Sequence, residues 1–315
     1  MDGDTRGLGS RVMDGLGRPP RRLLVLGGAA AALAVLVDRG LRLDVPPPPS
    51  PAPTRRPAPD EPLLLSAVAD LTGLVEAATD VISASDGDPL VRRLRSVNRE
   101  QLRVLRGRLT NSGVPTSVIH AAVAAPAPAV ATRTRSALAD LLASIGPEQW
   151  TALTTATTGT RELLAAAYAQ RLAAAVLLGH AVETSTSPSP ARAAVVARTQ
   201  PLVYAFEVVA AQSAGVQRRT AESTLAELVR LDLAVSGTGY TTPGGWALPF
   251  PVTTSADARR LATEVLGAAI DAATEVAGPR PTAASLEDVA RWSAIVQALA
   301  VDWDVPLTAF PGASA

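Results

Sequence analysis

The chain has 315 residues, equal numbers of acidic and basic side chains, and no cysteine. A net charge of zero argues against a body that traps nucleic acid electrostatically. The lack of cysteine excludes disulfides, thiolate chemistry and cysteine-based zinc sites. The length suffices for about two domains. Only 3 % of the residues are aromatic, and the alanine-rich segments favour helix. We therefore expect an all-α fold.

The amino-terminal segment has the layout of a membrane-targeting sequence. Residues 1–22 carry five arginines and precede fifteen residues without a polar side chain, 23–37. The positive-inside rule then predicts a cytoplasmic start and a body outside the cell membrane. Fifteen residues give about 22 Å of helix, short of the roughly 30 Å hydrocarbon core, so we extend the single membrane-spanning helix to 23–41. A cleaved signal peptide is the alternative, including an export signal around Arg21 and Arg22.

A proline-rich linker, 42–62, follows this helix. Its nine prolines lie between Pro46 and Pro62 and prevent helix and sheet. The tract favours polyproline II at about 3.1 Å per residue, which could hold the body about 50 Å from the bilayer. We interpret it as a spacer, and a site for a proline-recognition domain is the alternative.

The first half of the body, 63–183, has apolar residues at helical spacing. One seam reads Leu64, Val68, Leu71, Val75, Ala78 and Ile82. Asp60 and Pro62 supply good starting chemistry for that helix. A second seam runs through 89–109 and is interrupted by Asn98. We expect two more helices, at about 138–145 and 148–183, after a loose Ala/Pro stretch. Four helices with short links predict an antiparallel bundle.

A Ser/Thr/Pro segment, 184–191, is predicted to link this bundle to a second one, 192–315. The helices of the second bundle are expected at 192–217, 220–236, 255–277 and 283–303. Eight of the ten aromatic residues lie from Tyr204 onward, so this half should have the better-specified core. The irregular segment 236–251 is expected to fold over one end of the bundle and bury Trp246 and Phe250, or else to form a recognition surface.

Three blocks of the second half carry a family resemblance. They are Val203-Tyr204-Ala205-Phe206, then Trp246 to Val252 with its Leu-Pro-Phe-Pro core, then Trp303 with the ending Phe310-Pro311-Gly312. On these blocks, residues 194–312 resemble a ferritin-like family of unknown function found in exported actinobacterial proteins. The resemblance implies a four-helix fold and no particular activity.

The residues that would hold iron in a ferritin-type site are missing. Where the resemblance implies Glu-His, this chain has Thr199 and Gln200. A di-iron site needs Glu-x-x-His pairs on facing helices, but His120 and His180 are the only histidines and neither follows a glutamate at that spacing. We therefore expect no metal ligands and no cofactor. A carboxylate-only metal or redox site remains the alternative, drawn from Glu207, Glu222, Glu227 and Glu264.

The second helix of the first half is strongly basic. It carries Arg92, Arg93, Arg95, Arg99, Arg103, Arg106 and Arg108 against one acid, Glu100. The preferred interpretation is a solvated face paired with Asp70, Glu76 and Asp80 of the neighbouring helix. The alternative is contact with anionic lipid headgroups or wall polymers. The absence of interleaved aromatic residues argues against single-stranded nucleic acid.

No catalytic constellation emerges. A nucleophile needs an activating base, and we expect both His120 and His180 to be structural, the latter at the carbonyl end of a helix. Gly237-Thr238-Gly239 lacks the features of a phosphate-binding loop. We expect a membrane-anchored, extracytoplasmic interaction or scaffold protein that is not an enzyme and has no catalytic, cofactor or metal residues. Its protein partner is unknown.

Overall fold

A computed structural model describes residues 55–85, 87–124, 134–182, 189–236 and 245–313. Within these ranges the regular elements are helices and no strand occurs, which confirms the all-α prediction for the described part. The predicted cytoplasmic start, the membrane helix at 23–41 and most of the linker lie outside the described residues. Residues 1–56 and 57–315 form two units, and all the helices named below lie in the second.

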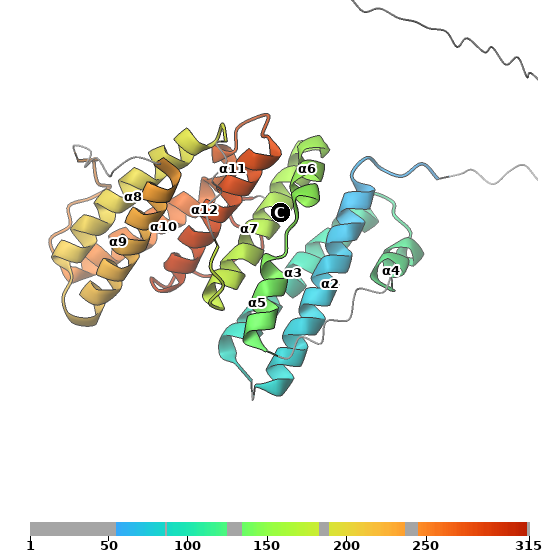
Figure 1. Ribbon diagram of the computed structural model, residues 1–315, viewed down its shortest axis with the longest axis horizontal. Coiled ribbons are helices and arrows are strands. Elements are labelled where there is room, and N and C mark those ends of the chain that lie inside the picture. The colour runs from blue at the N-terminus through green and yellow to red at the C-terminus, as the bar shows by residue number, and fades with distance from the viewer. Residues whose placement is uncertain (1–54, 86, 125–133, 183–188, 237–244, 314–315) are drawn as a thin grey trace, which may run out of the picture. The chain divides into compact units, whose positions relative to one another are not determined.

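In the described residues, the first half of this unit forms six helices (Figure 1). They are α2 (Glu61–Ala84), α3 (Pro89–Asn111), α4 (Thr116–Ala124), α5 (Arg135–Ala143), α6 (Pro147–Thr155) and α7 (Thr158–Leu177). α2 and α3 form a hairpin, α4 packs against α2, and α5 packs between α2 and α7. The predicted seam of α2 faces this first core, with Leu64, Val68 and Leu71 all buried. Asn98, which interrupts the α3 seam, is also buried.

The described part of the second half forms five helices. They are α8 (Arg192–Gln212), α9 (Gly215–Ser236), α10 (Ser255–Asp271), α11 (Ala273–Val276) and α12 (Ala283–Val301). α8 packs against both α9 and α10, and α12 packs against α10. Phe206, Trp292 and Trp303 are buried in this second core, and the rings of Phe206 and Trp303 meet edge to face at 5.5 Å. The aromatic core expected for this half is therefore present.

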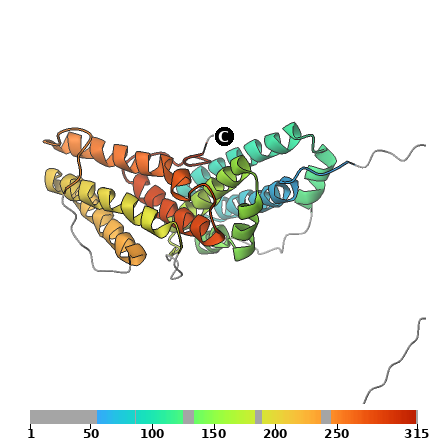
Figure 2. The ribbon, with the colours of Figure 1, turned by 90° about the horizontal axis from the view of Figure 1, so that it is seen from above.

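Two helices, α7 and α12, join the halves. They lie side by side and run in the same direction in both views (Figures 1 and 2). α12 buries Leu286, Ala290 and Ala294 in the first core and buries Val289 and Trp292 in the second. One helix thus belongs to two cores. The boundary predicted at 184–191 stays a prediction, because most of that segment lies outside the described residues.

The single helix expected over 148–183 is wrong: the chain forms α6 and α7 with a break at Thr157. The cause is Asp60, whose carboxylate accepts hydrogen bonds from the backbone N–H of Thr157, at 3.2 Å, and from its hydroxyl. Asp60 therefore fixes the start of α7, and it makes no side-chain cap on α2. α7 ends at Leu177, two residues before Gly179 with φ +97°.

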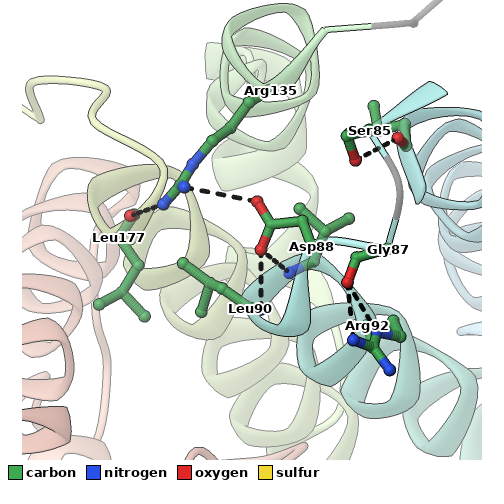
Figure 3. Close-up of polar contacts among 9 residues, drawn as sticks. Ser85, Gly87, Asp88, Leu90, Arg92, Arg135 and Leu177 are labelled. Atoms are coloured by element: carbon green, nitrogen blue, oxygen red, sulfur yellow. Dashed lines mark hydrogen bonds and ion pairs between the residues drawn. The ribbon is translucent and has the colours of Figure 1, made fainter.

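The opposite end of the α2–α3 hairpin is tied to α5 and α7 by polar contacts (Figure 3). Asp88 caps α3 by accepting from the backbone N–H of Leu90 at 2.8 Å. Its second carboxylate oxygen lies 3.4 Å from Arg135, at the start of α5. Arg135 also donates to the carbonyl oxygen of Leu177, the last residue of α7, at 3.1 Å. One arginine thus links three helix ends.

The C-terminal tail, residues 302–313, crosses from the second half to the first. Phe310 is buried in the first core, and the carbonyl oxygen of Ala309 accepts from Gln101 of α3 at 2.7 Å. Gly312 has φ +71°, and a Cβ placed on it would lie 2.6 Å from the carbonyl oxygen of Ile270. Only glycine suits that position. The Phe-Pro-Gly ending is therefore a docking element between the halves.

Within the described residues, α2 is the one helix long and apolar enough to cross a membrane by length and composition. A core helix passes the same test, and nine residues of α2 are buried in the structure.

Candidate functional site

A cavity of about 360 Å³ lies where α7 and α12 begin; we call it the junction cavity. One face of α7 lines it with Arg161, Ala165 and Ala169, and one face of α12 with Ala290 and Ser293. The turn around α11 and Pro311 of the tail complete the wall. The small side chains of Ala165, Ala166 and Ala169 on α7 and of Ala290 on α12 leave room for this space between the longer lining residues.

The exposure of the lining residues shows which side of the cavity is open to solvent. Glu162 and Pro279 are exposed and mark the mouth, whereas Ala166, Ala290 and Ser293 are buried and form the floor. The floor is apolar apart from the Ser293 hydroxyl, which accepts a hydrogen bond from Gln297 at 3.0 Å. The cavity is therefore a hydrophobic pocket with a polar mouth, as is typical of sites for small apolar ligands.

Arg161 is the cation of this mouth. Its guanidinium donates to the carbonyl oxygen of Ala156 at 3.4 Å and to the Thr158 hydroxyl at 3.2 Å. No carboxylate of the described residues lies within ion-pair distance of it. The N-terminal ends of α7 and α12 both lie at this end of the pair, and each contributes a partial positive charge. The mouth therefore favours an anionic group.

A smaller cavity of about 180 Å³ lies beneath the tail, beside Gln297, Thr308 and Pro311. Gln297 is 3 % exposed, and its Oε1 has no hydrogen-bond partner in the described part of the chain. The Gln297–Ser293 hydrogen bond connects the linings of the two cavities.

A groove of about 540 Å³ lies at the other end of α7 and α12; we call it the His180 groove. The Nδ1 of His180 lies 3.0 Å from a carboxylate oxygen of Asp140 on α5. Glu227 and Arg230 form an ion pair on the α9 side. Among the described residues, no serine or threonine lines this groove, so the structure places no hydroxyl nucleophile of the described part beside the His–Asp pair. Forty residues separate the pair in sequence, so no local sequence pattern relates them.

The four glutamates of the carboxylate-only alternative do not converge. Glu222, Glu227 and Glu264 each pair with an arginine of their own helix, and Glu207 lies half-buried on α8. Across the described ranges no three His, Asp or Glu side chains are close enough to hold a metal ion. Thr199, at the position where the resemblance implies a ligand, is buried and accepts from the indole of Trp292 at 3.0 Å. The only other histidine, His120, is exposed on α4.

Five arginines of α3 form a stripe; we call it the arginine stripe. Its members are Arg92, Arg95, Arg99, Arg103 and Arg106. At about 100° per residue they fall within roughly 80° of the helix circumference. Arg95 and Arg106 reach the hydroxyls of Thr79 and Thr72 on α2, at 3.5 and 3.3 Å. A surface groove of about 540 Å³ runs between the two helices there.

The expected pairing of this face with α2 is not what the structure shows. No ion pair joins Asp70, Glu76 or Asp80 to an arginine of α3 among the described residues; the pair on the stripe is Arg103–Glu100, within α3 itself. Asp70 lies half-buried and interacts electrostatically with Arg171 of α7 instead. The stripe is therefore left largely to solvent.

A buried charge lies inside the first half. Arg171 is 4 % exposed, lies 5.7 Å from the ring centroid of Tyr168, and donates to the carbonyl oxygen of Leu141 at 3.4 Å. Burial lowers the pKa of Arg171, and Asp70 opposes that shift. Burial raises the pKa of Asp70, and it raises the pKa of Tyr168 to about 12. Arg171 lines none of the cavities and grooves described above, so we treat this group as structural.

Comparison of the chain with family models, curated proteins and solved structures finds no match. The ferritin-like resemblance of the second half therefore stays a prediction.

Proposed function

We propose that this chain is a membrane-anchored, extracytoplasmic interaction protein, without enzymatic activity, whose arginine stripe binds anionic lipid headgroups. In this proposal the second half is a ferritin-like four-helix bundle without metal ligands, and it acts as a scaffold. The observation that carries the proposal is the stripe itself: five cations on one face of α3, opposed there by Glu76 and Glu100.

The stripe has the dimensions of a surface-binding element. Arg92 and Arg106 are fourteen residues apart, which is about 21 Å along a helix. Arg99, at its centre, makes no hydrogen bond or ion pair with any described residue and is exposed. Each arginine near an anionic membrane surface contributes about 1 kcal/mol. A guanidinium also fits phosphate bidentately, which an ammonium cannot do.

The predicted anchor and linker strengthen such contacts. A body tethered to the bilayer meets its headgroups at high effective concentration, provided that the linker can reach. The linker predicted at 42–62 has that reach, at about 3.1 Å per residue. Weak individual contacts of the stripe would then suffice to hold the body in one orientation at the membrane.

The test uses the full chain in nanodiscs of neutral lipid, mixed with vesicles that contain or lack an anionic phospholipid. Cosedimentation should be preferential for the anionic vesicles and should weaken as salt rises. Replacing Arg99, Arg103 and Arg106 by glutamine should weaken binding on the order of 100-fold. The matched control makes the same charge change on α9, at Arg218, Arg219 and Arg230, which are exposed. Equal loss in both triple variants would refute the stripe as the binding surface.

A further inference from the structure

We propose that the junction cavity binds a single-chain anionic amphiphile, with its hydrocarbon chain between α7 and α12 and its anionic head at Arg161. This site lies apart from the arginine stripe: the cavity is lined by α7, α11, α12 and the tail, whereas the stripe is on α3. Failure of one proposal therefore would not count against the other.

The chain-binding part is the apolar interior. Its volume of about 360 Å³ lies within the range of ligand pockets, roughly 300–1,000 Å³. Apolar cavities of about 150 Å³ already stay free of water and accept benzene. Ala166, Ala169 and Ala290 form walls with no polar side-chain atoms, so water bound beside these walls would have few hydrogen-bond partners. A hydrocarbon chain can pack against these apolar walls. Each methylene buried in this way should strengthen binding about threefold to fourfold.

The head-binding part is the mouth. Arg161 donates hydrogen bonds to two neutral oxygens and has no carboxylate partner among the described residues. The two helix N-termini add positive potential at the same end. Glu162 is the one acid in the lining, and it is exposed. Charge complementarity therefore favours an anionic head over a neutral or cationic one.

One buried polar group offers a further anchor. Ser293 is 2 % exposed and lines the cavity. Its oxygen accepts from Gln297, and its own hydroxyl hydrogen has no acceptor among the residues that the structure describes. It can donate one hydrogen bond inside an otherwise apolar space, which suits a chain with a polar substituent but does not require one.

The experiment photolabels the full chain in neutral-lipid nanodiscs with dodecanoate that carries a diazirine on its chain. Peptide mapping should place the label on α7 and α12, beside the cavity. Unlabelled dodecanoate should compete better than dodecanol, and dodecyltrimethylammonium should compete worst. Shortening the competitor by two carbons should raise its half-competing concentration about tenfold.

Three variants connect the result to the cavity. Arg161→Gln should raise the half-competing concentration of dodecanoate about tenfold or more and leave that of dodecanol within twofold. The matched control Glu162→Gln removes the neighbouring charge and should not weaken dodecanoate. Ala165→Leu places bulk in the cavity from a half-buried position and should reduce labelling by all probes. Ala277→Leu fills the cavity from the α11 side and replaces Ala165→Leu in the experiment if that variant folds poorly.

Label spread evenly over other helices, equal competition by the three head groups, or full labelling of both filling variants would each overturn the proposal. Anionic-vesicle binding by Arg161→Gln is measured in parallel. We expect it to be unchanged, which separates failure of this site from failure of the arginine stripe.

Discussion

Both cores bury tryptophan, but the indole groups differ in their partners. In the second core, Trp292 donates to Thr199 at 3.0 Å and Trp303 donates to Thr224 at 3.1 Å. In the first core, the indole nitrogen of Trp150 has no partner in the described part of the chain, although its ring meets Tyr168 edge to face at 5.3 Å. The same residue type is thus fully satisfied in one half and left short of one hydrogen bond in the other.

The difference does not extend to the other buried polar groups. Buried side-chain atoms without a hydrogen-bond partner among the described residues occur in the first half on Asn98, Gln101, Trp150, Gln170 and Arg171, and in the second half on Ser189, Asp232, Asp288 and Gln297. A buried polar atom without a partner costs roughly 1–3 kcal/mol, whereas a satisfied one stabilises modestly. Loss of the polar partner should therefore be costly at Trp292 and Trp303, whose indoles are paired, and apolar replacement should be better tolerated at Trp150.

The largest effect is expected from removing a tryptophan side chain. Trp303→Ala should lower the free energy of unfolding by about 3–5 kcal/mol, because it leaves a large cavity beside Phe206. Trp150→Ala should cost a similar amount, since both side chains are 1 % exposed. Urea denaturation followed by circular dichroism gives both values.

Phenylalanine replacements separate volume from hydrogen bonding. Trp303→Phe should cost about 1–2 kcal/mol more than Trp150→Phe, because only the first leaves a buried threonine without its donor. Equal costs would show that the Trp303–Thr224 hydrogen bond adds nothing to stability, and the contrast between the cores would then fail.

The next largest effect is expected at the tail. Gly312→Ala should destabilise by at least about 2 kcal/mol, because φ +71° alone disfavours a side chain by roughly 1–2 kcal/mol and the new Cβ would overlap the carbonyl oxygen of Ile270. The matched control is Gly278→Ala, with φ +78° and no atom within 4 Å of the added Cβ. Hydrogen exchange of the Gln101 side chain and of residues near Phe310 should increase in the first variant only.

A smaller loss is expected where only a hydrogen-bond partner is removed. Thr199→Val keeps the shape of the side chain but leaves the Trp292 indole unpaired, so it should cost roughly 1–2 kcal/mol. Combining it with Trp292→Phe should restore part of the loss, since both partners are then apolar. A double-mutant cycle without coupling between the two sites would contradict this account.

The sequence was a good guide to helices and a poor guide to sites. Periodicity predicted α2, α3, α8, α9 and α12 to within a few residues at most of their ends, because amphipathic spacing is a local property. It missed the α6–α7 break, which depends on Asp60 reaching Thr157 across 97 positions. It also missed α4, where Ala/Val content gave no clear seam.

The candidate site could not be read from the sequence for a related reason. The junction cavity is lined by three alanines of α7 and by Ala290 of α12, and small residues in an alanine-rich chain carry no individual signal. The Phe-Pro-Gly ending was visible as a motif, but its role as a dock on the first core depends on contacts with Gln101 and Ile270. Those contacts join parts of the chain that no periodicity relates.

The smallest changes in the free energy of unfolding are expected at two aspartates, one in each half. The two changes should have opposite signs. Burial raises the pKa of both Asp70 and Asp232. Arg171 lowers the pKa of Asp70 against the effect of burial, whereas burial alone acts on the pKa of Asp232. Asp232 is 2 % exposed, and one of its carboxylate oxygens has no hydrogen-bond partner among the described residues. At neutral pH, Asp70→Asn should destabilise by leaving Arg171 buried without its counter-charge, and Asp232→Asn should stabilise slightly.

The pH dependence fixes the sign of the Asp232 effect. A carboxyl whose folded-state pKa lies above its unfolded value of about 3.9 binds more protons when folded, so stability falls as pH rises through the folded pKa and is regained below it. Asp232→Asn should remove this contribution to the pH dependence of the free energy of unfolding, in the range between the unfolded-state pKa and neutral pH. Urea denaturation at several pH values checks this, with the exposed Asp271→Asn as control. If Asp232→Asn destabilised the protein at every pH, the Asp232 carboxylate would have to be satisfied inside the second core, and that core would be more polar than its hydrogen bonds indicate.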